Sequence, residues 1–159
     1  MGIGKTFEKE FKESVPNNCF YLRLKDGTAA YDKSSKVRFQ THNICDCIVF
    51  GQEYSYFIEL KNCNLTSLPF GNIRETQLEE MSAIDHPKIK AYFMVCFREK
   101  ERCFIVEAQK IKEFIETATR KSIPIKWFIE NGIEIKMTRK IKRYRYELER
   151  VLKWILRKC

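Results

Sequence analysis

The chain has 159 residues, of which 44% are hydrophobic and 13% aromatic; this fits one folded domain with its own core and excludes a disordered chain. No apolar run approaches the length of a membrane span and no secretory signal is visible, so we expect a cytoplasmic protein that does not use a membrane. Seven cysteines without a CxxC pair argue against a disulfide framework and a zinc ribbon, and suit a reducing compartment.

The net charge of +9 is concentrated at the C-terminal end. Residues 138–159 contain nine Lys or Arg and two Glu, which gives +7 and leaves +2 for the remainder of the chain. Such a basic segment suits a polyanion. Nucleic acid and an anionic membrane surface both qualify, and a solvated basic helix without a ligand is the plain alternative.

The first segment, MGIGKTFEKEF, superficially resembles two short motifs that we reject. The residues GKT at 4–6 lack the earlier glycine and the preceding strand that a phosphate-binding loop needs. The opening Met-Gly fits a myristoylation signal, but one acyl chain anchors a protein only marginally. We instead expect an amphipathic helix over residues 3–14, with Phe7 and Phe11 one turn apart.

Strands and helices alternate along the rest of the chain. Alternating β-branched and aromatic residues predict strands, and apolar residues three or four apart predict helices. The expected strands cover residues 19–25, 46–51, 54–61, 91–97 and 102–108, and the expected helices cover 73–84, 109–118 and the last twenty residues. Between them we expect a polar connection or projecting hairpin at 26–43, a loop at 62–72, and a helical turn followed by a strand within 123–137. This order predicts an α/β fold with one mixed central sheet flanked by helices.

The stretch CDCIVFGQEYSYFIELK contains the residues that point to chemistry. Glu59 and Lys61 are two residues apart on a predicted strand, so both side chains project from the same face. Asp46 precedes the neighbouring strand, and a short turn between the strands brings it beside them. Two carboxylates and an ammonium group then converge among apolar residues, where charged groups are costly unless they serve one another or a metal.

This combination is typical of metal-dependent phosphodiester hydrolysis. Two carboxylates favour a hard divalent ion, and we expect Asp46 and Glu59 to bind Mg²⁺, for which Mn²⁺ would substitute. The ion lowers the pKa of a bound water and stabilises charge on the phosphate. Lys61 would orient or deprotonate the water, or stabilise the transition state. An exposed Glu-Lys pair on an edge strand is the structural alternative.

Five segments in order resemble the PD-(D/E)xK nuclease superfamily and, within it, the RecU-type Holliday junction resolvases. They are GKTFE at 4–8, Asp46, ELK at 59–61, TSLPFGNI at 66–73 and QLEEM at 77–81. Together they span roughly residues 4–135. Cys45 departs from the proline that many superfamily members carry at this position.

The resemblance implies a restriction-endonuclease-like core with a nuclease domain over residues 1–137. The charge and the apolar spacing of residues 138–159, which lie beyond the resemblance, predict a C-terminal basic amphipathic helix. It implies a homodimer with two active sites that cuts branched DNA during recombination and repair. Glu8 and Gln77 would assist Asp46, Glu59 and Lys61 in catalysis.

Basic residues in two segments are candidates for DNA binding. Residues 26–43 fall where the family projects a stalk into the junction, and this segment is short and polar here. The C-terminal segment places apolar residues on one helical stripe, at Ile141, Tyr144, Leu148, Val151 and Ile155. The basic side chains would then face outward toward the DNA backbone. The expected DNA-binding residues are Lys33, Lys36, Arg38, Arg139, Lys140, Lys142 and Arg143.

Other functions remain open on the sequence. The chain could be a superfamily nuclease that acts on duplex ends, nicks or specific sites. It could also be a DNA-binding module whose acidic residues do no chemistry, or a protein that uses its basic tail at a membrane surface.

Overall fold

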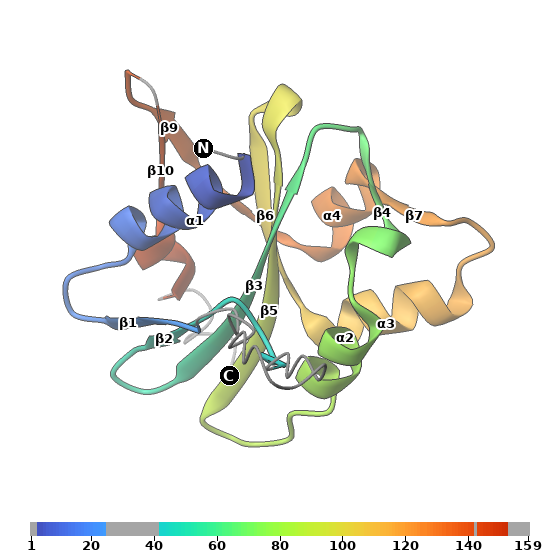
Figure 1. Ribbon diagram of the computed structural model, residues 1–159, viewed down its shortest axis with the longest axis horizontal. Coiled ribbons are helices and arrows are strands. Elements are labelled where there is room, and N and C mark those ends of the chain that lie inside the picture. The colour runs from blue at the N-terminus through green and yellow to red at the C-terminus, as the bar shows by residue number, and fades with distance from the viewer. Residues whose placement is uncertain (1–2, 25–41, 142, 153–159) are drawn as a thin grey trace, which may run out of the picture.

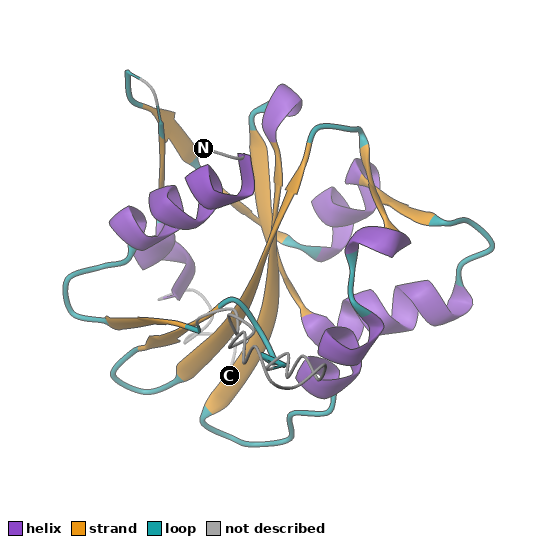
Figure 2. Ribbon diagram, viewed as in Figure 1, coloured by secondary structure: helices purple, strands orange, loops and turns teal. Residues whose placement is uncertain are grey.

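The computed structural model describes residues 3–24, 42–141 and 143–152. A six-stranded sheet runs through the middle of the molecule in the order β1-β2-β3-β5-β6-β8, with helices on both faces (Figures 1 and 2). Its strands are β1 (Phe20–Arg23), β2 (Cys47–Phe50), β3 (Ser55–Cys63), β5 (Ile89–Phe97), β6 (Arg102–Glu107) and β8 (Ile133–Ile135). The helices are α1 (Ile3–Ser14), α2 (Glu75–Ser82), α3 (Ala108–Thr117) and α4 (Ile125–Asn131).

The sheet is mixed, which confirms the predicted fold class. β3 pairs in parallel with β5, and the other neighbouring strands are antiparallel. A parallel pair needs a crossover connection, and here the crossover contains α2. The crossover places α2 on one face of the sheet, where it covers alternate side chains of β3.

The first core lies between the sheet and α1. Phe7 and Phe11 of α1 are fully buried, and they belong to the same apolar cluster as Tyr56, Ile58 and Leu60 of β3. Alternation along β3 therefore turns its even-numbered residues toward α1. The predicted helix at 3–14 is confirmed, and it forms because its apolar stripe covers this face of the sheet.

The second core lies on the opposite face, under α2, α3 and α4. Phe93, Phe104 and Phe128 are buried there in one cluster that also includes Cys63 at the end of β3. The odd-numbered residues of β3, Glu59 among them, therefore face α2. A carboxylate is thus directed into an otherwise apolar layer.

The predicted loop at 62–72 is partly wrong. It contains the short strand β4 (Ser67–Pro69) and the 3-10 helix η1 (Phe70–Asn72). β4 pairs with β7 (Ser122–Pro124), which is far away in the sequence. Local residue preferences could not reveal this pairing, because it depends on how the sheet brings two distant connections together.

The predicted helix over 138–159 is also wrong in its first part. β9 (Met137–Arg139) and β10 (Tyr144–Tyr146) form an antiparallel hairpin, and helix is found at 148–152. Ile141 is 97% exposed at the hairpin tip, so it does not belong to an apolar stripe. Leu148 and Val151 are buried in the α1 core, as a packing helix would require.

The hairpin forms because α1 offers it specific partners. The ring of Tyr146 packs on Phe7 with 5.6 Å between the centroids. The backbone N–H groups of Tyr144 and Tyr146 donate to the Glu10 carboxylate at 3.0 Å and to the Ser14 hydroxyl at 3.1 Å. These contacts outweigh the helical spacing of the apolar residues, since tertiary packing overrides local propensity.

Some predictions lie outside the described residues. Most of the expected stalk at 26–43 falls there, together with Lys33, Lys36, Arg38 and Lys142. Where the chain is described, no helix has the length and apolar character needed to cross a membrane.

Candidate active site

The start of β2 and the middle of β3 bring Asp46, Glu59 and Lys61 together. Cys47 pairs with Ile58, so the residue before β2 lies beside the next residues of β3. An oxygen of Asp46 accepts the Leu60 N–H at 2.8 Å, which holds the aspartate against β3. The Lys61 ammonium lies 2.8 Å from a Glu59 oxygen, and Glu59 is only 2% exposed. The three side chains therefore lie together, as the alternation along the predicted strand indicated.

Gln77 in the first turns of α2 completes this group. Its amide nitrogen donates to the second oxygen of Glu59 at 3.3 Å and to the Asn43 carbonyl at 3.2 Å. Its amide oxygen is buried and, among the described residues, is the one such side-chain atom without a hydrogen bond. Buried acceptors are nearly always satisfied, so this oxygen marks a place for a water or a cation.

The electrostatics of the site push Glu59 toward its neutral form. Burial, and after it the charge of Asp46, raise the pKa of Glu59 to about 7. Lys61, through its charge and its hydrogen bond, and then Arg74, oppose the rise in pKa. A perturbed carboxylate beside a second carboxylate indicates a functional site, because such a pair is relieved by a cation.

Glu8 is not in contact with this group. It extends from α1 and forms an ion pair with Arg23 of β1 at 2.7 Å. Burial raises the pKa of the Tyr21 phenol, and the charges of Glu8 and Asp46 both contribute to the rise. Glu8 therefore lies near the β1–β2 edge that leads to Asp46. It does not join Asp46 and Glu59 in a common ligand set.

The donor set suits a hard divalent ion. Asp46 and Glu59 offer carboxylate oxygens. The amide oxygen of Gln77 could accept a hydrogen bond from a water bound to the ion. Within residues 3–24, 42–141 and 143–152, no group of three or more His, Cys, Asp or Glu side chains is arranged to hold a metal. An ion here would therefore retain several waters, as Mg²⁺ usually does.

Arg74 is a residue near the site that the sequence analysis missed. It occupies the N-cap position of α2, three residues before Gln77, and its side chain is exposed. Its charge lowers the pKa of Glu59, so it lies within electrostatic reach of that carboxylate. Its position three residues before the predicted Gln77 could have indicated that Arg74 lies near the site.

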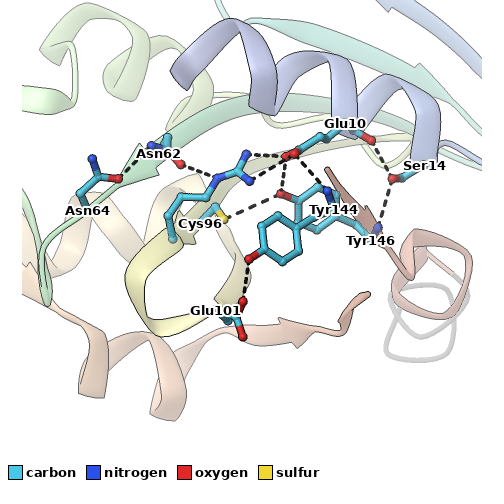
Figure 3. Close-up of polar contacts among 9 residues, drawn as sticks. Glu10, Ser14, Asn62, Asn64, Cys96, Glu101, Tyr144 and Tyr146 are labelled. Carbon is cyan, nitrogen blue, oxygen red and sulfur yellow. Dashed lines mark hydrogen bonds and ion pairs between the residues drawn. The ribbon is translucent and has the colours of Figure 1, made fainter. Parts of the chain in front are cut away.

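Glu10 was missed as well; it is buried and lies among polar partners that include Tyr144 and Tyr146 (Figure 3). The Arg98 guanidinium pairs with both Glu10 oxygens and donates to Asn62 at 3.0 Å. The Tyr146 hydroxyl and the Tyr144 N–H also donate to Glu10, at 3.1 and 3.0 Å. Its position between Phe7 and Phe11 on the apolar stripe of α1 was the signal for burial.

The described residues among the expected DNA contacts lie on the C-terminal hairpin. Arg139 and Lys140 are exposed near its tip, and Arg143 forms an ion pair with Glu13 of α1 at 3.0 Å. A hairpin docked on α1 thus carries the basic side chains that were expected on a helix.

A mixed sheet covered by helices on both faces, with buried acids and a lysine on adjacent strands, defines a nuclease-like α/β core. The family model described as RecU, Recombination protein U, matches residues 12–146. The chain belongs to the RecU family.

Curated relatives agree with this assignment at modest identity. The chain is 27% identical to the Holliday junction resolvase RecU of Staphylococcus epidermidis, over 84% of this chain and 73% of that protein. It is 29% identical to the resolvase of the same name from Ureaplasma parvum, over 52% and 49%. It is also 26% identical to the SPbeta prophage-derived uncharacterized protein YotM of Bacillus subtilis, over 98% and 87%.

Proposed function

We propose that this protein is a structure-specific endodeoxyribonuclease that resolves four-way DNA junctions by Mg²⁺-dependent phosphodiester hydrolysis, in recombination and repair. The observation that carries the proposal is Glu59, a buried carboxylate held by Lys61 and Gln77 beside Asp46. Membership of the RecU family, and relatives named as Holliday junction resolvases, support the choice of substrate.

In this proposal each residue of the site has a defined task. Asp46 and Glu59 hold the divalent ion, which supplies activation of water and stabilisation of phosphate charge when bound. Lys61 would orient the attacking water, or would take its proton after losing one of its own to solvent. The amide oxygen of Gln77 accepts a hydrogen bond from a water at the site, and Glu8 assists from the β1 side.

We expect metal binding to depend on the protonation of Glu59. Without a metal, the pKa of Glu59 near 7 leaves this carboxyl partly neutral at physiological pH. Glu59 would lose that proton to solvent when the site holds a divalent cation, since the cation would favour the charged form of both carboxylates. Lys61 would then be released from Glu59 and be free to act on the water.

The wider assembly is also a proposal. Two-fold symmetry suits a four-way junction, so we propose a homodimer with two active sites that works in the cytoplasm. The nuclease domain is proposed to cover residues 1–137. Arg139, Lys140 and Arg143 of the hairpin would contact the DNA backbone. The same is proposed for Lys33, Lys36, Arg38 and Lys142.

The test is cleavage of a labelled four-way junction beside a linear duplex of matched sequence, with Mg²⁺, with Mn²⁺ and with EDTA. The proposal predicts symmetric nicks in the junction that require a metal and are absent from the duplex. Equal cutting of both substrates would remove junction specificity and leave a general nuclease. Tight junction binding without cleavage under every condition would reduce the protein to a DNA-binding module.

A further inference from the structure

Three lysines on α1 form an exposed stripe that the proposed function does not use. Lys5, Lys9 and Lys12 are spaced at i, i+4 and i+7, so they lie on one side of the helix, while Phe7 and Phe11 face the core. All three lysines are exposed. Within the described structure none of them forms a hydrogen bond or an ion pair.

The stripe borders a groove between α1 and β1. The groove has a volume of about 530 Å³, and Tyr21 and Arg23 of β1 form its other side. Glu8 and Glu13 of α1 also line it. Figure 1 shows α1 lying alongside β1, with the β9–β10 hairpin on the other side of the helix.

The groove is net positive, because four basic and two acidic side chains line it. Its two carboxylates already have partners, because Glu8 pairs with Arg23 at 2.7 Å and Glu13 pairs with Arg143 at 3.0 Å. The three lysines are left without a counter-charge in the described residues. Three unpaired ammonium groups along one groove suit an anion that repeats its charge, rather than a single small anion.

The dimensions match a nucleic-acid backbone. Seven residues of helix rise about 10 Å, and phosphates follow one strand of a duplex at about 3.4 Å of axial rise each. Because a strand winds around the duplex axis, its path is longer than its axial rise, and the stripe extends over about two successive phosphates. Lysine provides a flexible point charge, which suits contacts to phosphate oxygens without base recognition.

The groove also borders the strand that holds the backbone of Asp46. Arg23 on its wall pairs with Cys47 across the β1–β2 ladder. One residue further on, the Leu24 N–H donates to the backbone carbonyl of Asp46 at 3.0 Å. A strand lying along the groove would therefore arrive beside the start of β2, where the acidic residues begin.

We propose that the groove between α1 and β1, with Lys5, Lys9 and Lys12 along it, binds the sugar-phosphate backbone of the DNA arm next to the cleaved phosphate. The inference rests on the proposed function, because it assigns a path for the same substrate. The groove supplies affinity and alignment without reading sequence. Glu8 and Arg23, which form an ion pair, line the groove.

The test removes the charge of the stripe and compares it with an equal change elsewhere. The variant K5Q/K9Q/K12Q is matched by K110Q/R120Q/K121Q, which removes three exposed positive charges around α3. Junction binding is measured by fluorescence anisotropy in EDTA, over a range of salt concentrations. A third variant, K5R/K9R/K12R, keeps the charge and controls for damage to α1.

We expect the groove variant to bind at least about 10-fold more weakly than wild type near physiological salt. The slope of log affinity against log salt concentration should fall by the equivalent of about two phosphate contacts. The control and the arginine variant should stay within about 2-fold. Equal weakening in the groove variant and the control, or an unchanged salt dependence in the groove variant, would overturn the inference. Binding in EDTA is independent of cleavage, so a wild-type protein that binds through the groove but cuts no DNA would contradict the proposed function alone.

Discussion

Two buried glutamates on opposite faces of the sheet have very different surroundings. Glu10 and Glu59 are 1% and 2% exposed. Glu10 accepts hydrogen bonds from Arg98, from the Tyr146 hydroxyl and from the Tyr144 N–H. Glu59 is held by Lys61 and Gln77 and also faces the charge of Asp46, and its pKa rises to about 7.

The difference fits a structural role for Glu10 and the proposed catalytic role for Glu59. Donors from β10 and from Arg98, the residue after β5, satisfy Glu10, so this carboxylate fastens the C-terminal hairpin to α1 (Figure 3). Glu59 has a second carboxylate as a neighbour and an unsatisfied Gln77 oxygen nearby. A buried charge whose hydrogen bonds are all satisfied holds elements together. A carboxylate with a raised pKa beside a second carboxylate is instead a candidate cation ligand.

The largest effect is expected for Glu59→Gln. Cleavage of the junction should fall about 10⁴-fold, equivalent to about 5 kcal/mol, because the metal loses a carboxylate ligand. Thermal unfolding without metal should show equal or higher stability, since a costly buried charge is removed. A variant that unfolds at a clearly lower temperature would place Glu59 in the same structural class as Glu10.

The next largest effect is expected for Glu10→Gln. Arg98 would be left mostly buried without its carboxylate, so unfolding in urea should show a loss of about 3 to 4 kcal/mol. The melting temperature should fall by roughly 10 °C. The exposed Glu13→Gln is the matched control on the same helix and should change stability by less than about 1 kcal/mol. Equal losses in both variants would remove the distinction for Glu10.

The raised pKa of Glu59 predicts a pH dependence of stability. The folded protein binds this proton more tightly than the unfolded chain, whose carboxyl titrates near 4.5. Stability from this group is therefore present below about pH 4.5 and is lost as the pH rises to about 7, by about 2 to 3 kcal/mol. Urea unfolding in EDTA should show this loss in wild type relative to Glu59→Gln, and parallel pH profiles would contradict it.

A smaller effect is expected for Gln77→Met. Loss of the amide should reduce single-turnover cleavage about 10- to 100-fold, because Glu59 loses a donor and the water loses an acceptor. Stability should change little, since a buried unsatisfied oxygen disappears with the amide. The exposed Gln109→Met on α3 is the control, and an equal loss of activity there would exclude a specific role for Gln77.

The smallest effect is expected for Glu8→Gln. Glu8 pairs with Arg23 and does not contact Glu59, so cleavage should fall only about 10-fold. Stability should change by less than about 1 kcal/mol, because the pair is partly exposed. A loss as large as that of Glu59→Gln, measured in the same single-turnover assay, would make Glu8 a metal ligand in the DNA complex.

Sequence patterns predicted the parts of this molecule that depend on local order. Alternation along residues 54–61 predicted that Glu59 and Lys61 share a face, and the short turn before them predicted that Asp46 lies alongside. The family resemblance then indicated Gln77, which does contact Glu59. The helical pattern of α1 was equally clear.

The remaining features depend on contacts between distant residues. The pairing of β4 with β7 joins segments far apart in the chain. The spacing of Tyr144 and Leu148 suggested a helix, but the partners that fix Tyr144 and Tyr146 in a strand lie on α1. The Glu10–Arg98 pair could not be predicted for the same reason: its two residues are far apart in the chain, and the position of Glu10 on an apolar stripe does not indicate its partner.

The most direct test of the account compares Glu59→Gln and Glu10→Gln in one single-turnover assay on the labelled four-way junction with Mg²⁺, at a temperature where both variants are folded. The account predicts that Glu59→Gln binds the junction as wild type does and leaves it uncut, while Glu10→Gln cuts at close to the wild-type rate. Cleavage by Glu59→Gln at the wild-type rate would contradict the assignment of the active site to this carboxylate.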